Sequence, residues 1–205
     1  MKRYRELFAI PNVWVLVLAS FPARVSYGMV ALAIFFKTEQ ATGSVAVAGL
    51  AIGINSLAGA ATAGLRGSLM DRFGQKWPLR IFVPGYASMM LILNTMQDKN
   101  AILVAAFIMG ITAPPINLSV RPLWKMVVPE DCLRTAYAVD TSVMSTAGVI
   151  GPVVATSLAL SSHPGSALNV AAAFMAIGGG ALALTHISRD WVPEKKDPNH
   201  TSLWR

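Results

Sequence analysis

Six long apolar runs dominate this sequence of 205 residues and limit what the chain can fold into. The runs cover residues 12–36, 45–65, 78–96, 101–120, 136–160 and 167–187. A helix of about 20 apolar residues crosses a hydrocarbon core of about 30 Å, so each run can span a bilayer. The short connections leave no room for a soluble catalytic domain. We therefore predict an all-α integral membrane protein, with a six-helix bundle over residues 12–187 between polar tails at 1–11 and 188–205.

Composition excludes the main alternative classes of protein. Charged residues make up 13% of the chain, whereas soluble globular chains have about 25%. Hydrophobic residues make up 54%, which is the opposite of what disorder requires. Cys132 is the one cysteine, so the chain has no internal disulfide and no cysteine-based zinc cluster.

Lysine and arginine residues gather on one side of the predicted bundle. Fourteen of the seventeen lie in or directly beside residues 1–11, 66–77, 121–135 and 188–205, whereas the other connections carry only Lys37 and Lys99. The positive-inside rule then places both termini in the cytoplasm, and we expect a multi-pass protein of the plasma (inner) membrane. Because the basic residues are dispersed over short loops, the net charge of +7 does not indicate a nucleic-acid partner.

Polar side chains occur at membrane depth in three of the predicted spans. Ser20, Arg24 and Tyr27 share one face of the first span. A charge at mid-membrane usually faces a bundle interior or a water-filled cavity, so we expect this face to line a transport cavity. A purely structural arginine is the alternative. Asn55 in the second span and Asn117 in the fourth are assigned to the same cavity.

The second and fourth spans have further unusual stretches. Asn55, Gly59, Thr62 and Arg66 follow one stripe of the second span, and two prolines at 114–115 interrupt the fourth. Interrupted helices often mark transport sites, but a kink can equally be a matter of shape. The two prolines alone do not decide between these interpretations.

Asp140 is the one acidic residue inside a predicted span. It could carry a proton, pair with Arg24, or lie at the membrane interface. With a helical rise of 1.5 Å per residue, Arg24 lies deeper than Asp140 by about 8–10 Å, so a direct pair needs the arginine side chain to reach toward the cytoplasm. We expect an interface or structural role for Asp140.

Small residues recur at four-residue spacing in two spans, which predicts closely packed helices in lipid. One set is Gly49, Gly53, Ser56, Ala60 and Gly64, and the other is Ala147 and Gly151. No catalytic constellation accompanies them, and no histidine pairs with a cysteine or carboxylate at metal-ligand spacing. We predict no enzymatic activity, no cofactor and no metal site.

The segment 67–76 reads GSLMDRFGQK and follows the second span. From the residues, Gly67 would permit close approach of another helix, and Gly74 would permit the positive φ of a tight turn. Asp71 would cap a helix N-terminus, where a negative charge is favourable.

This segment resembles the signature loop between helices two and three of the major facilitator superfamily, G-x-L-x-D-R-x-G-R-R/K. Gln75 departs from the pattern, and the matching residues are Gly67, Leu69, Asp71, Arg72, Gly74 and Lys76. In the fifth span, Gly148, Gly151 and Pro152, downstream of Asp140, resemble the core of the Gly-Pro motif of the superfamily's proton-coupled antiporters. The glycines that usually follow that proline are absent here.

The resemblance implies that the chain is the amino-terminal six-helix half of a transporter, with a 3+3 inverted repeat and a central linker that begins near residue 188. It implies alternating access against a second six-helix half in the lipid bilayer. The first and fourth helices would line the cavity and the Asp71 loop would latch the halves together. The implied function is transport of a small-molecule substrate, with efflux by proton antiport as the preferred subclass. The alternatives are a truncated, non-transporting membrane protein or interaction module, and a half-transporter that acts as a homodimer.

Overall fold

The computed structural model describes residues 2–161 and 165–191, and helices make up nearly all of them. In chain order the helices are α1 (Lys2–Phe8), α2 (Pro11–Thr42), α3 (Val45–Phe73), α4 (Lys76–Thr95), α5 (Lys99–Thr112), α6 (Ile116–Val127), α7 (Glu130–Ala159), α8 (Ser166–Leu184) and α9 (His186–Asp190). No strand occurs within these described residues. The predicted all-α fold is confirmed.

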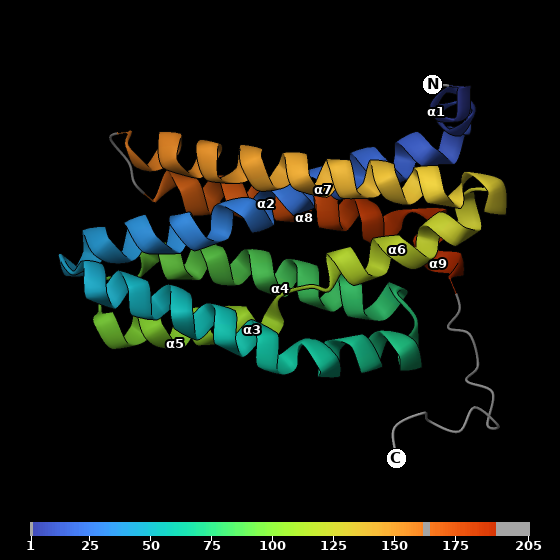
Figure 1. Cartoon of the computed structure of the whole chain (residues 1–205). Helices are drawn as coiled ribbons and strands as arrows, with labels where there is room; N and C mark the ends of the chain where they lie inside the picture. The colour runs from blue at the N-terminus through green and yellow to red at the C-terminus, as the bar shows by residue number, and fades with distance from the viewer. Residues whose placement is uncertain (1, 162–164, 192–205) are drawn as a thin grey trace, which may run out of the picture.

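The six apolar runs form long rods that lie side by side, with α5 and α6 as one interrupted rod (Figure 1). The turn between α3 and α4, the connection from α6 to α7, and the short helices α1 and α9 all lie at one end of the bundle. The connections from α2 to α3 and from α4 to α5 lie at the other end. The predicted basic segments therefore share one end wherever the structure describes them. Their cytoplasmic orientation stays a prediction.

Within the described residues, five of the rods are long and apolar enough to cross a membrane. The exception is α4, which has 20 residues but carries Arg80 and Pro84 within its length. It packs along α8 and runs with it through the bundle (Figure 1). Its inner face buries Val83, Tyr86 and Met90 in the common core.

The helices extend further than the apolar runs predicted. Because α3 continues to Phe73 and α7 begins at Glu130, the segments 66–77 and 121–135 are mostly helical and not loops. An apolar run predicts only the part of a helix that lies in hydrocarbon. The helical backbone hydrogen bonds continue beyond that part until a residue such as glycine ends the helix. Gly74, with a φ of 73°, is such a stop after α3.

The closest helix crossings occur where a glycine meets a neighbouring backbone. A Cβ added to Gly151 would lie 2.6 Å from the Cα of Gly28, so α7 and α2 touch through bare backbone. Gly110 of α5 and Gly178 of α8 make similar crossings with α3 and α2. Small residues at crossings let helices approach closely in lipid. The predicted close packing at Ala147 and Gly151 is confirmed, since Ala147 is also buried.

The small residues of α3 do not pack as predicted. A Cβ added to Gly49, Gly53 or Gly64 would meet no atom within 4 Å, and Ser56 and Ala60 are exposed. Spacing identifies a face of small residues but not the neighbour that meets it, and here the face points away from the other rods. In the most apolar stretch of each helix, only 17% of the residues are buried in α3 and 22% in α7. The buried share is 50% in both α2 and α8.

Candidate functional site

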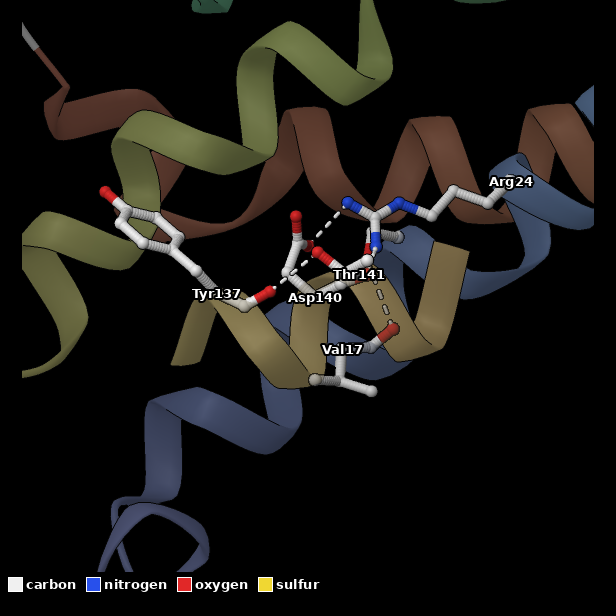
Figure 2. Close-up of polar contacts among 6 residues, drawn as sticks. Val17, Arg24, Tyr137, Asp140 and Thr141 are labelled. Carbon is white, nitrogen blue, oxygen red and sulfur yellow. Dashed lines mark hydrogen bonds and ion pairs between the residues drawn. The ribbon is translucent and has the colours of Figure 1, made fainter. Parts of the chain in front are cut away.

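Arg24 of α2 and Asp140 of α7 form a buried ion pair (Figure 2). Nη2 of Arg24 donates to Oδ1 of Asp140 at 2.6 Å, and Nη1 donates to the backbone oxygen of Asp140 at 3.3 Å. The arginine is 3% exposed and the aspartate 6%. The arginine side chain extends along the bundle to the carboxylate, which is the reach that the predicted difference in depth requires for a direct pair. Of the three alternatives for Asp140, the contact with Arg24 is therefore present.

The other two polar residues on this face of α2 have different neighbours. Ser20 is buried, and its Oγ donates to the oxygen of Val17 within the same helix at 3.3 Å. The Tyr27 hydroxyl donates to the backbone oxygen of Pro114 at the break between α5 and α6. The face predicted to line one cavity therefore divides between α7 at Arg24 and the α5–α6 break at Tyr27.

The fourth rod is not kinked but fully interrupted over residues 113–115. A break leaves the carbonyl groups at the end of α5 without helical partners. Arg66 of α3 reaches these groups. Its Nη1 donates to the oxygens of Gly110, at 3.3 Å, and Ala113, and its Nη2 donates to Gly59 at 2.5 Å. One guanidinium thus bridges two helices at the break.

Arg66 is the functional candidate that the sequence did not identify. It lay in a segment predicted to be a cytoplasmic loop, yet its exposed fraction is 9%. Its Nε is buried without a hydrogen-bond partner in the described part of the chain. The signal available was the stripe that it shares with Asn55, Gly59 and Thr62.

A cavity of about 220 Å³ lies beside the break. Its polar lining comes from Tyr27, Arg66 and Asn117. Two of the five residues assigned to a cavity are therefore brought together, and Arg66 joins them. Asn55 lies apart from this lining, where its Nδ2 donates to the oxygen of Ala106 at 3.0 Å and so ties α3 to α5.

The segment that matched the signature loop has a different structure from the one predicted. It forms the last turns of α3, a tight turn at Gly74 and the start of α4. The prediction for Gly74 is confirmed by its positive φ. The prediction for Asp71 is wrong, because this residue lies inside α3 and the N-cap of α4 is Gln75. Gly67 has no neighbour within 4 Å of an added Cβ, so it makes no close crossing among the described residues.

The side chains of this segment point to two environments. Asp71 and Arg72 are exposed, Leu69 is 37% exposed, and Lys76 is partly buried. Gln75 is fully buried, and its Nε2 donates to the oxygen of Ser119 in α6 at 3.0 Å. The residue that departs from the family pattern therefore joins α4 to α6.

The fifth-span motif is only partly packed within the six rods. Gly151 meets Gly28, whereas Gly148 has open space around it. Pro152 lies inside α7 without ending the helix, which runs on to Ala159.

Comparisons with known proteins address the family to which the chain belongs. The Major Facilitator Superfamily model matches residues 16–205. An uncharacterized MFS-type transporter of Sinorhizobium fredii, y4rN, is 26% identical over 191 residues, which are 91% of this chain and 47% of that protein. The chain thus spans about half the length of the curated relative that it matches. No solved structure matches it. Because the family match covers nearly the whole helical bundle, this multi-pass membrane chain belongs to the Major Facilitator Superfamily.

Proposed function

We propose that the chain is one half of a secondary transporter that moves a small solute by alternating access. The family is one of transporters and not of enzymes. The observation that carries the proposal is the interrupted α5–α6 rod, with a cavity lined by Tyr27, Arg66 and Asn117 at the interruption. Discontinuous helices at membrane depth form the substrate sites of many transporters.

A second six-helix unit completes the transporter in this proposal. The exposed small-residue face of α3 and the sparsely buried α7 support it, because both would otherwise meet lipid. Small residues suit a helix interface in a membrane. The similar S. fredii protein is about twice as long as the aligned part of this chain. In this proposal the second unit is a separate chain or another copy of this chain.

The segment 67–76 at the end of α3, which resembles the family's signature loop, would act as the latch between the halves. Asp71 and Arg72 are exposed there, and no described acidic or basic side chain forms an ion pair with either of them. Charged side chains from a second half could therefore bind them in one state of the cycle and release them in the other.

Efflux by proton antiport at the plasma membrane is the subclass that we propose. The supporting feature is the buried pair of Arg24 and Asp140. A proton that binds a carboxylate oxygen of Asp140 removes its negative charge and weakens the bond to the guanidinium. Since the pair joins α2 to α7, its protonation state can bias how the two helices pack.

Inside-out vesicles from cells that express the chain test this proposal. ATP builds an acid interior, and a pH-sensitive dye follows it while small organic acids and amines are added in turn. An exported solute should release protons, and Asp140→Asn should abolish that release. The matched control is Asp131→Asn, which changes an exposed acid in the first turn of the same helix. Equal proton release by the wild type and Asp140→Asn would contradict the antiport role.

A further inference from the structure

We propose that the cavity at the α5–α6 break binds the carboxylate of a small organic acid, with Arg66 as the main cationic contact. The proposal names the substrate class of the transporter proposed above and rests on that function. The cavity of about 220 Å³ is smaller than the range of about 300–1,000 Å³ that is usual for drug-sized ligands. Its occupant is therefore a small molecule.

The charge of Arg66 favours an anionic ligand. Its hydrogen-bond partners are three backbone oxygens. In the part of the chain that the structure describes, the one ion pair joins Arg24 to Asp140, so no carboxylate neutralises Arg66. A buried charge is costly unless it is paired. A ligand anion in the cavity would supply the missing charge, and the buried Nε of Arg66 has no hydrogen-bond partner within the described residues.

The N-terminus of α6 also favours an anion, because this helix begins at Ile116 beside the same cavity. No side chain among the residues that the structure describes caps this end. The backbone N–H groups of Asn117 and Leu118 donate to no acceptor within the described residues, and both residues line the cavity. A helix N-terminus carries a partial positive charge and attracts anions. Half-helices in transporters direct such ends at anionic substrate groups.

The rest of the lining decides between an organic and an inorganic anion. Most of it is apolar, and it comes from Ala63, Ala113, Pro114, Pro115, Ile116 and Leu118. These walls match a hydrocarbon or aromatic body attached to one charged group. A bare inorganic ion would lose its hydration against them without compensation.

A purely structural role for Arg66 makes a different prediction. In that case the arginine only satisfies the carbonyl groups at the end of α5, and charges elsewhere on the cavity wall have no effect on ligands. Asn117 separates the two cases, because it is exposed and lines the cavity, and its side chain has no hydrogen bond to the α5 carbonyl groups in the described structure. Asn117→Asp adds a negative charge to the cavity wall and leaves the Arg66 bonds in place.

The experiment measures binding of radiolabelled benzoate and of neutral benzamide to the purified full chain in mild detergent. Benzoate should bind at least about tenfold more tightly than benzamide, since a hydrogen bond to a charged group contributes about that much to affinity. Arg66→Gln and Asn117→Asp should each weaken benzoate binding by at least about tenfold. The controls are Arg121→Gln and Asn100→Asp, which change exposed residues of α6 and α5.

Benzoate that does not bind, or that binds no better than benzamide, overturns the proposal. Benzoate binding that Asn117→Asp leaves unchanged overturns it too, even if Arg66→Gln fails to fold. Binding is measured without transport, so the two proposals fail separately. If benzoate binds selectively but no solute moves in vesicles, the carboxylate site is supported and the proposed transport function is refuted. If only neutral solutes move and benzoate does not bind, the proposed transport function is supported and the carboxylate site is refuted.

Discussion

Arg24 and Arg66 are both buried in the bundle, but their charges are met in different ways. Arg24 has a carboxylate partner at 2.6 Å, whereas Arg66 donates to backbone oxygens of Gly59, Gly110 and Ala113. The first arrangement neutralises the charge and joins two helices. The second satisfies most of the N–H groups, but no carboxylate in the described part of the chain neutralises the positive charge beside the cavity. The comparison teaches that burial alone does not identify a binding residue, and that an unneutralised charge is the better indicator.

Asp140→Ala should have the largest effect on stability. It leaves the Arg24 guanidinium buried without its carboxylate, and breaking a buried pair in this way costs about 3–5 kcal/mol. Thermal unfolding in detergent measures the loss. The double variant Arg24→Ala/Asp140→Ala should recover part of it, because the unpaired charge is gone. A double variant less stable than either single one would contradict a neutralising pair.

Gly151→Val tests the helix crossing that brings the pair together. An added Cβ would lie 2.6 Å from Gly28, so α7 must move away from α2, and overpacking of this kind costs about 1–3 kcal/mol. The matched control is Gly148→Val on the same helix, where the space is open. Equal unfolding temperatures for the two variants would show that the crossing is not as close as described.

Arg66→Met sharpens the difference between the two arginines. The carbonyl groups at the end of α5 lose their donors, and each unsatisfied buried group costs about 1–3 kcal/mol. Since Arg66 has no carboxylate partner among the described residues, the effects of Arg66→Met and Asp140→Ala should add within about 0.5 kcal/mol. A larger coupling in the double variant would mean that the two arginines share one electrostatic network.

Asp71→Asn should have the smallest effect on stability. The side chain is exposed, and surface substitutions usually change stability by less than about 0.5 kcal/mol. Transport by the assembled protein should nevertheless fall, because the latch to the second half loses a charge. Membrane insertion, followed by immunoblotting of washed membranes, should be normal. Full transport at normal expression would favour an ordinary helix end.

The class of fold could be predicted because each of its signals is local. An apolar run of about 20 residues specifies a membrane helix without reference to its neighbours. The two prolines at 114–115 predicted an interruption, and Gly74 predicted a turn with positive φ, for the same reason. Both signals act through the backbone of the residue itself. The inverted repeat has no such local signal and stays a prediction.

The contacts between helices could not be predicted, because they depend on how each rod is rotated. The stripe of small residues on α3 had the right spacing for packing but faces outward. Arg66 lies beyond the apolar run, which predicts a loop there, whereas α3 continues for another two turns to Phe73. The bond from Arg24 to Asp140 was one open alternative, since a long side chain can bridge a difference in depth that the helical rise alone leaves open.

The mass of the detergent-purified protein tests most directly whether this chain is one half of a transporter. Light scattering, corrected for detergent, gives that mass for the same sample whose solute uptake is then measured in liposomes. The account predicts particles with two six-helix units, and therefore a protein mass of at least twice the 21.8 kDa of this chain, and it predicts uptake only from such particles. A stable 21.8 kDa monomer that moves solute unaided would contradict the account, because a complete pathway would then lie within these six rods.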